Sequence, residues 1–258
     1  MKVWITGASS GIGEACAYEY AAQGACLVLT ASSADKLTRV ADRCLGLGAA
    51  GAVAMPYDLQ DPSGITGLCQ QAWDAFSGID ILFCNAGVSQ RTRIEDTSMD
   101  MVRKIMEINY FAPVAICKGI LPRMTARGKG HIAVTTSIAG RFGFPLRCGY
   151  SSSKFALYGF FETLAAEHGE INVTMVCPGR VQTNISMNAL VEGGARYGKM
   201  DPGQAGGLDV AKAARKITRA IAKGKREVLV GRKELLMVYI KRFFPGLCAR
   251  LARKLKPV

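Results

Sequence analysis

The stretch "TGASSGIG", residues 6–13, decides the fold that this sequence predicts. A strand-like run, Val3–Thr6, precedes it, and a helix-like stretch rich in alanine, Gly13–Gln23, follows it. A glycine-rich turn between a strand and a helix suits a phosphate group, because free N–H groups at the helix N-terminus face the turn. The context therefore favours a phosphate-binding loop over a plain tight turn, which is the alternative reading of the same glycines.

Each glycine of this loop has its own task. Gly7 allows the tight turn, Gly11 lets the backbone approach a phosphate, and Gly13 lets the helix pack closely on the strand.

Strand-like apolar runs alternate with helix-length stretches along the chain. The runs are Val3–Thr6, Cys26–Thr30, Ala52–Pro56, Ile79–Cys84, His131–Thr135, Asn172–Cys177 and Glu227–Val230. This alternation predicts a single doubly wound α/β domain, with a parallel sheet of about seven strands and helices on both faces. We expect this domain over residues 1–231, with a lid at about 184–208, and a basic tail over residues 232–258.

The length and the cysteine pattern exclude several classes of protein. A chain of 258 residues suits one α/β domain, and no apolar run of about 18 residues predicts a membrane-spanning helix. The start, "MKVWITG", lacks the pattern of a signal peptide. Nine cysteines lie scattered without metal-ligand spacing, so we expect no metal site and a reducing, cytoplasmic location.

The positive charge is concentrated at one end of the chain. The net charge is +13, and residues 212–258 hold 15 Lys or Arg and 2 Glu, which also gives +13. The first 211 residues are therefore neutral, and the excess needs a local explanation. No nucleic-acid-binding motif accompanies it, so we do not expect a nucleic-acid partner.

Ordered motifs resemble the short-chain dehydrogenase/reductase family over about residues 2–231. By this resemblance, a nicotinamide cofactor is held by Gly7, Ser9, Ser10, Gly11, Ile12, Gly13, Ser32, Ser33, Asp58, Leu59, Asn85, Ala86, Gly87, Tyr150, Lys154, Pro178, Gly179, Val181 and Thr183. The implied catalytic residues are Asn109, Ser137, Tyr150 and Lys154. In the lid, "TN" followed by "RYGKMD" is similar to the dehydrogenase/reductase member-seven branch, near the hydroxysteroid dehydrogenases.

In "GYSSSKFAL", residues 149–157, Tyr150 and Lys154 are four residues apart and share one face of a helix. A nearby ammonium favours the phenolate, so we expect Lys154 to lower the pKa of Tyr150 from its reference value near 10. Tyr150 would then donate a proton to a carbonyl oxygen while a hydride reaches the carbon. The resemblance implies that Ser137 binds this oxygen and that Asn109 holds a water that supplies protons toward Lys154.

The choice between NAD and NADP depends on the residues after the second strand. The chain reads "LVLTASSADKL" there, without the acidic residue near Ala31 that would bind a ribose hydroxyl and repel a 2′-phosphate. No arginine follows either, but the hydroxyls of Ser32 and Ser33 can bind phosphate. We therefore expect NADP(H), with NAD(H) as the alternative.

Aromatic and apolar residues near the predicted site favour a hydrophobic, lipid- or steroid-like ketone or secondary alcohol. We expect Ser137, Phe142, Phe144, Met187 and Tyr197 to contact it. The alternative is that the apolar residues of the lid only pack it onto the body. A non-catalytic cofactor-binding sensor or scaffold, and an isomerase or dehydratase, are the alternatives to an oxidoreductase.

The basic tail and two long helices are candidate interaction surfaces. In the tail, Leu247, Leu251 and Leu255 recur at period four opposite basic residues, which is typical of a helix that lies on an anionic membrane surface. Packing on its own domain or on a partner is the alternative. The family resemblance implies a homodimer or homotetramer, through Asp100–Arg127 and Gly149–His168.

Overall fold

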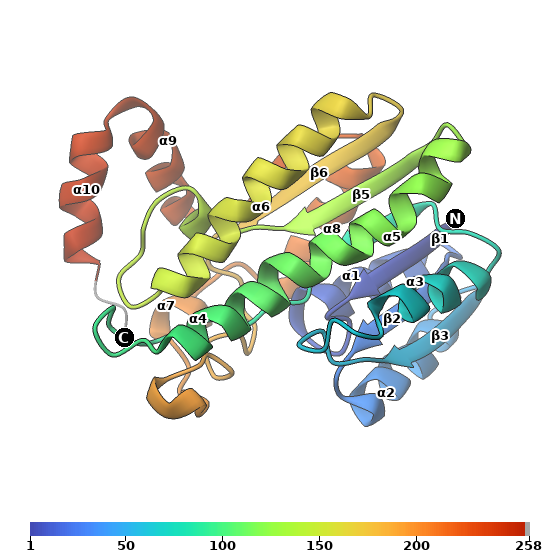
Figure 1. Cartoon of the computed structure of the whole chain (residues 1–258), viewed down its shortest axis with the longest axis horizontal. Helices are drawn as coiled ribbons and strands as arrows, with labels where there is room; N and C mark the ends of the chain where they lie inside the picture. Colours follow the sequence, from blue (N-terminus) through green and yellow to red (C-terminus); the bar gives the residue numbers. More distant parts are fainter. Residues whose placement is uncertain (256–258) are drawn as a thin grey trace.

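A seven-stranded sheet forms the centre of the molecule, whose computed structural model describes residues 1–255 (Figure 1). All strands are parallel, in the order β3-β2-β1-β4-β5-β6-β7, which confirms the predicted doubly wound fold. The strands are β1 (Lys2–Thr6), β2 (Cys26–Ala31), β3 (Gly51–Pro56), β4 (Ile81–Cys84), β5 (Gly130–Thr135), β6 (Ile171–Pro178) and β7 (Glu227–Val230).

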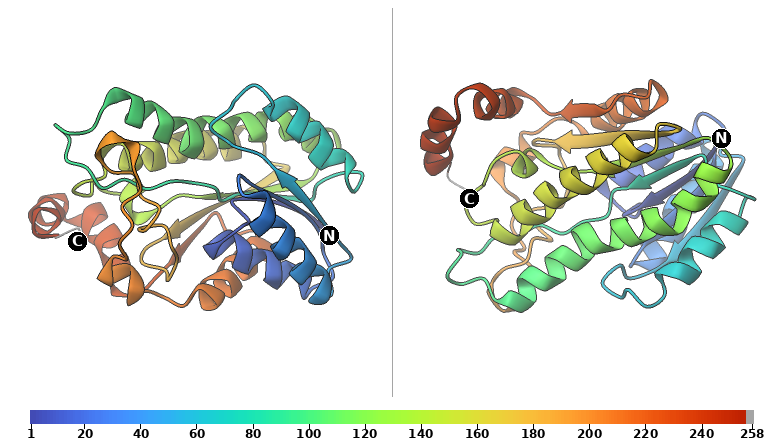
Figure 2. Two further views of the ribbon diagram at one scale, coloured as in Figure 1. Left: turned by 90° about the horizontal axis from the view of Figure 1, so that it is seen from below. Right: turned by 45° about the horizontal axis from the view of Figure 1, so that its top comes forward.

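Helices cover both faces of this sheet, as the left view of Figure 2 shows. One face carries α1 (Gly11–Ala21), α2 (Ala34–Gly46) and α8 (Val210–Ala222). The other carries α3 (Ile65–Asp74), α5 (Ala112–Ala126) and α6 (Cys148–Glu167), with α4 (Met99–Met106) leading into α5. The other helical segments are η1 (Glu107–Phe111), η2 (Ile138–Gly140), η3 (Glu192–Gly194), α7 (Pro202–Ala205), η4 (Lys233–Leu235), α9 (Leu236–Phe243) and α10 (Pro245–Lys254).

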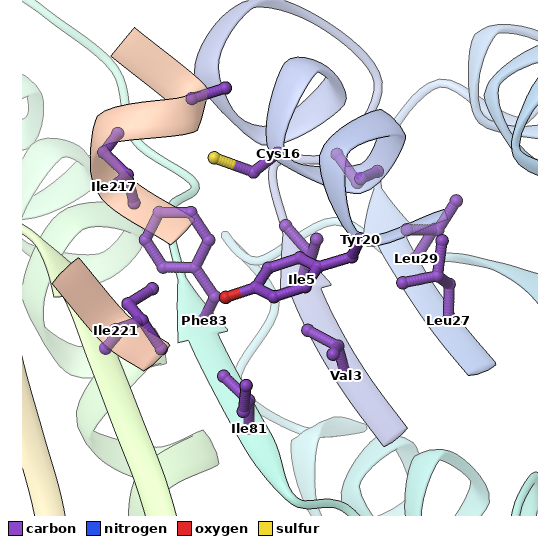
Figure 3. Close-up of a cluster of buried hydrophobic side chains, with 14 of the residues drawn as sticks. Val3, Ile5, Cys16, Tyr20, Leu27, Leu29, Ile81, Phe83, Ile217 and Ile221 are labelled. Atoms are coloured by element: carbon purple, nitrogen blue, oxygen red, sulfur yellow. The ribbon is translucent and has the colours of Figure 1, made fainter. Parts of the chain in front are cut away.

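Alternate strand residues point into two separate cores. Val3 and Ile5 of β1 pack against α1 and α8 on one face, in the cluster drawn in Figure 3. Trp4, between them, points to the other face, where its indole N–H donates to the Thr30 hydroxyl at 2.9 Å. Because the sheet is buried on both faces, its strands are apolar throughout rather than alternating.

The order of the strands locates the functional site. The chain builds β1, β2 and β3 toward one edge, then crosses back and places β4 beside β1. At such a reversal the connections leave the sheet in opposite directions, which opens a crevice at the carboxyl ends of the two central strands. These ends are Thr6 and Cys84, and they carry the glycine loop and Asn85.

The long helix predicted over Asp100–Arg127 is present but irregular. A single π turn, η1, separates α4 from α5, and the Ala112 N–H bonds to the Glu107 carbonyl, five residues back. An inserted residue of this kind cannot be recognised from apolar periodicity, and π turns are frequent at functional sites. Asn109 lies at its centre.

The tail packs partly onto the body. Cys248 of α10 is buried, and Leu255 packs with it and with Phe142 in one cluster at the carboxyl ends of β5 and β6. The leucines predicted to form one apolar face of the tail therefore do not share one environment: Leu247 is exposed, while Leu255 packs on the body. Figure 1 shows α9 and α10 at one side of the molecule, and residues 256–258 of the predicted tail lie outside the described residues. Within residues 1–255, no helix has the length and apolar character that crossing a bilayer requires.

His131, on β5, is a buried titratable group whose ring contacts Thr174 of β6. Its Nε2 lies 2.8 Å from the Thr174 hydroxyl, which itself donates to the Lys225 carbonyl, so Nε2 carries the proton and donates. Burial lowers the pKa of His131 from 6.5 to about 4. Between pH 6.5 and about 4, His131 is therefore protonated in the unfolded chain but stays neutral in the folded state.

This linkage predicts acid-sensitive stability. The contribution of neutral His131 is complete above pH 6.5 and is lost as the pH falls from 6.5 to about 4, by about 2 kcal/mol at pH 5. Urea unfolding of the wild type and of His131→Gln at several pH values measures the difference. A variant whose free energy of unfolding falls as steeply with pH as that of the wild type would contradict the assignment.

Candidate functional site

A cleft of about 310 Å³ opens at the carboxyl ends of the central strands. It brings together most of the residues that the sequence singled out. Those lining it are Gly7, Ser9, Ser10, Gly11, Ile12, Ser32, Asp58, Leu59, Asn85, Ala86, Gly87, Ser137, Tyr150, Lys154, Pro178, Gly179, Val181 and Thr183. They come from the ends of six different strands and from helix α6, so only the folded sheet places them side by side.

The glycine loop forms one end of this cleft. Gly7 and Gly11 both have positive φ, +66° and +62°, a conformation that glycine adopts without strain. A Cβ on Gly13 would overlap the Gly7 carbonyl oxygen and lie 2.6 Å from Asn85 Nδ2, so only glycine fits there. Gly13 lies behind the cleft wall and keeps α1 close to β1, as predicted.

The start of α1 is open to a ligand. Ser10 occupies its N-cap position, but the Ser10 side chain makes no cap hydrogen bond to the helix. The first N–H groups of a helix need an outside partner, and they carry a partial positive charge. Because Ser10 and Gly11 line the cleft, these donors are placed for an anion within it.

Asn85 ties the glycine loop to the neighbouring strands. Its Nδ2 lies 3.3 Å from the carbonyl oxygens of both Thr6 and Gly7, and its Oδ1 accepts from the Thr135 hydroxyl at 3.0 Å. The Thr6 hydroxyl accepts in turn from the N–H groups of Asn85 and Ala86, at 3.1 and 3.2 Å. This network fixes the backbone of β1, β4 and β5 around the centre of the cleft.

Ser137, Tyr150 and Lys154 all line the cleft. Tyr150 and Lys154 lie one turn apart on α6, and both are buried. The Lys154 ammonium donates to the Thr135 carbonyl at 2.8 Å and lies 5.9 Å from the centre of the Tyr150 ring. Ser137 follows β5, and its hydroxyl accepts from the Ala139 N–H at 3.1 Å.

Asn109 lies behind these three residues rather than in the cleft wall. Its amide donates to the Val88 carbonyl and to the Ser153 hydroxyl, both at 3.0 Å, and its Oδ1 accepts from the Val88 N–H at 2.8 Å. These three bonds hold the strand end after Gly87 against α6. The role predicted for Asn109, water binding toward Lys154, stays a prediction.

The electrostatics of Tyr150 differ from the sequence-based expectation. Burial raises the pKa of Tyr150 above its ordinary value of 10.0, while the Ser137 hydroxyl and the charges of Arg147 and Arg91 act in the opposite direction. Burial also lowers the pKa of Lys154 from 10.5 to about 8. The expected lowering by Lys154 is thus not found, because burial dominates and two arginines supply the opposing positive charge.

Six other predicted residues do not line the cleft. Ser33 is the N-cap residue of α2, and Asn109 is described above. Phe142 and Phe144 turn away to pack with the tail, in the cluster that contains Cys177 and Cys248. Met187 is exposed on the lid, and the Tyr197 ring lies 6.0 Å from the Arg91 guanidinium carbon.

The sequence reasoning missed several polar residues of the site. Buried Gln90 accepts from the N–H groups of Gly149 and Tyr150, at 2.9 and 3.2 Å, and so holds the start of α6. Arg91 lines the cleft, and Gln204 of α7 bonds to the Val181 carbonyl and to the Thr183 hydroxyl. The only sequence signal for Gln90 and Arg91 is that they come three and four residues after the "NAG" motif.

These features fit a dinucleotide. The glycine loop has the close backbone approach that a pyrophosphate requires. A Cβ placed on Gly11 would lie only 3.2 Å from the Thr183 side chain, so glycine keeps this part of the cleft open. Within residues 1–255, no group of three or more His, Cys, Asp or Glu residues could hold a metal ion.

Comparison with known sequences gives a consistent result. A family model described as short chain dehydrogenase matches residues 1–192. The dehydrogenase/reductase SDR family member 7B of Mus musculus is 40% identical over 256 residues, which is 96% of this chain and 79% of that protein. The dehydrogenase/reductase SDR family protein 7-like of Anopheles gambiae is 41% identical over 234 residues, 88% of this chain and 74% of that protein.

Solved structures agree with this assignment. The alcohol dehydrogenase from Thermococcus sibiricus, complexed with 5-hydroxy-NADP, superposes with a TM-score of 0.77 at 26% identity, over 90% of this chain and 96% of that chain. A short-chain dehydrogenase/reductase from Burkholderia phymatum, in complex with NAD, has the same fold, with a TM-score of 0.84 at 24% identity over 100% and 96% of the two chains. The chain therefore belongs to the short-chain dehydrogenase family of NAD(P)-dependent oxidoreductases and is similar to its member-seven branch, as the motifs predicted.

Proposed function

We propose that this protein transfers a hydride between NADP(H) and a ketone or secondary alcohol with an apolar body. The observation that carries the proposal is that Ser137, Tyr150 and Lys154 line the same cleft as the glycine loop. A proton donor and a cofactor site that share one cleft are the minimum that carbonyl reduction needs.

A bound nicotinamide supplies the hydride that reaches the carbonyl carbon. The electron pair of the C=O bond then moves to the oxygen, which takes the phenolic proton of Tyr150 and leaves a phenolate. A buried phenol with a raised pKa keeps its proton at neutral pH, so the proton is present when the more basic alkoxide forms. Ser137, Arg147 and Arg91 favour the phenolate that remains, because each acts against the effect of burial on Tyr150.

The proposed preference for NADP(H) is supported by the end of β2. Ala31 and Ser32 line the cleft, and neither carries the charge that would repel a 2′-phosphate. The alcohol dehydrogenase from Thermococcus sibiricus, which binds a modified NADP, offers further support at 26% identity. The Ser32 hydroxyl is the side chain we assign to the 2′-phosphate.

An apolar substrate body is supported by other residues than those expected. Val88, Ile108 and Ile185 line the cleft together with Tyr150. Apolar walls with a few convergent polar groups are typical of small-molecule sites. We assign these three side chains to the apolar part of the substrate.

We also propose that the tail contacts an anionic membrane surface. Its exposed large apolar residues are Leu236, Tyr239, Phe243, Phe244 and Leu247, and Lys241, Arg242, Arg250, Arg253 and Lys254 are exposed beside them. Exposed aromatic residues flanked by positive charges match an interfacial helix, in which each basic residue near the surface contributes about 1 kcal/mol.

Tyr150→Phe removes the proton donor and retains the ring. We expect kcat/KM for a ketone to fall by about 10²- to 10⁴-fold, while calorimetric binding of NADPH stays within about threefold. Tyr158→Phe is the matched control, because Tyr158 is on the same helix but does not line the cleft, and its hydroxyl bonds to Thr136 and Glu227 instead. Equal activity of Tyr150→Phe and Tyr158→Phe would exclude Tyr150 as the donor.

Ser32→Asp places a carboxylate where the 2′-phosphate is expected. Charge repulsion should weaken NADPH binding by at least about tenfold and leave NADH binding unchanged or tighter, as measured by calorimetry. Ser33→Asp is the control, because Ser33 does not line the cleft and aspartate is a good N-cap residue. Tighter binding of NADH than of NADPH by the wild type would overturn the assignment.

Phe243→Ser with Phe244→Ser tests the tail. We expect the full chain to cosediment with phosphatidylcholine vesicles that contain phosphatidylserine, and the double variant to bind at least about tenfold more weakly, because it loses two apolar contacts. Ile94→Ser removes an equally exposed apolar residue outside the tail and should bind like the wild type. Failure of the wild type to cosediment would contradict the membrane proposal.

A further inference from the structure

One buried and one partly buried arginine, Arg91 and Arg147, stand in the wall of the cleft that Tyr150 also lines. Arg91 follows the "NAG" motif after β4, and Arg147 is the N-cap residue of α6, three residues before Tyr150. Both line the cleft, and their side chains are only 4% and 16% exposed. The positive charges of both act on the Tyr150 hydroxyl, so they lie on the side of the cleft where a substrate meets its proton donor.

Their charges are only partly compensated. Asp201, the N-cap residue of α7, places the same oxygen, Oδ2, 3.5 Å from Arg91 Nη2 and 3.7 Å from Arg147 Nη2. One carboxylate thus faces two guanidinium groups, and neither approach is a close bidentate pair. A net positive charge remains in a buried place, where an uncompensated charge is costly.

The two guanidinium groups also have unused donors. Arg91 bonds through Nη1 to the Ser89 hydroxyl at 3.2 Å and to the Gln90 carbonyl at 2.8 Å, which holds it in position. The Nε of Arg91 and the Nε of Arg147 have no hydrogen-bond partner in the described part of the chain. Arg147 stacks on the Phe144 ring, 4.6 Å from its centre, and this contact fixes the plane of its guanidinium. Buried donors without partners call for an explanation, and the Nε atoms of Arg127 and Arg141 are unpartnered in the same way, so it is the unbalanced charge in the cleft wall that points to a ligand.

We propose that Arg91 and Arg147 bind an anionic group of the substrate, a carboxylate or a phosphate. The inference deepens the proposed function and rests on it: the substrate would be a ketone or secondary alcohol that carries both an apolar chain and one anionic group. Arginine pairs carboxylates and phosphates through two parallel hydrogen bonds, and it retains its charge when buried. Binding the anion there compensates the excess charge and fixes the carbonyl beside Tyr150.

The pyrophosphate of a cofactor is a separate ligand in this assignment. Its donors are the free N–H groups at the start of α1, where Ser10 and Gly11 line the cleft. The arginines come from the opposite half of the sheet, from the connections after β4 and β5. Loss of either arginine is therefore expected to affect the anionic substrate and not the affinity for NADPH.

The test uses two matched pairs of substrates with NADPH. One pair is a γ-oxo acid and its methyl ester, and the other is the phosphate ester of an α-hydroxyketone and the free hydroxyketone. We expect kcat/KM to be at least about tenfold higher for the anion in one or both pairs. The pair with the larger ratio tells whether carboxylate or phosphate is preferred, and a ratio near one in both pairs overturns the inference.

Three variants then assign the preference to these side chains. Arg147→Met is expected to lower the anion-to-neutral ratio by at least about tenfold, whereas Arg93→Met, an exposed arginine two residues from Arg91, leaves it unchanged. Asp201→Asn retains an N-cap side chain but removes the competing carboxylate, so the ratio should rise. A fall of the ratio in Asp201→Asn, or an equal loss for anionic and neutral substrates in Arg147→Met, would show that the cluster only holds the lid and would overturn the inference.

Calorimetry keeps this inference distinguishable from the proposed function. The same two anions are titrated into protein saturated with NADP⁺, which cannot reduce them, for the wild type and for Arg147→Met. Absence of turnover with all four ketones would contradict the proposed function, while anion binding that Arg147→Met abolishes would still support the site. Turnover of neutral and anionic ketones at equal rates, without anion binding, would contradict the anion site at Arg91 and Arg147 but would support the proposed function.

Discussion

The hydrogen bonds between Thr6 and Asn85 are the constraint on which the rest of this structure depends. A parallel sheet that reverses its strand order must leave a gap between the two central connections. Here hydrogen bonds between Thr6 at the end of β1 and Asn85 after β4 join the two strand ends below the cleft. The Thr135 hydroxyl, which donates to Asn85, connects β5 to them. A Cβ on Gly7 would lie 2.7 Å from the Ala86 Cα, so the glycine loop can pack this closely on the end of β4 only with glycine at this position. The geometry of the cleft follows from this contact.

Burial, rather than one partner residue, controls the acid–base properties of the site. Tyr150, Lys154 and Arg147 are all removed from water, and burial is the largest influence on the pKa of each. It favours the neutral phenol and lowers the pKa of Arg147 to about 10, where the neighbouring Arg91 charge adds to the effect. Positive charge around a buried phenol limits how far its pKa can rise, so the arginines and the tyrosine form one electrostatic unit.

The sequence predicted most of the fold and the cofactor end of the cleft, since both depend on local patterns. The glycine loop, "NAG" and the Tyr150–Lys154 spacing are short motifs whose geometry is set within a few residues. The substrate end could not be predicted in this way, because Arg91, Arg147 and Asp201 meet only through contacts distant in sequence. Phe142 was assigned to the substrate for its aromatic character alone, whereas in the fold it packs with Cys248 of the tail, a competitor for apolar contact that periodicity cannot reveal.

The π turn at Glu107–Phe111 keeps the buried residues of α4 and those of α5 on the same side of the long helix. Each residue of a regular α-helix advances by about 100°, so the buried residues Ile116, Ile120 and Met124 would on average point about 80° away from Met101 and Ile105 if the helix were regular throughout. The extra residue in the π turn takes up this rotation. The apolar residues of α4 and α5 can therefore face the protein interior along the whole helix. Asn109 lies within the π turn itself, where its side chain reaches Val88 after the end of β4.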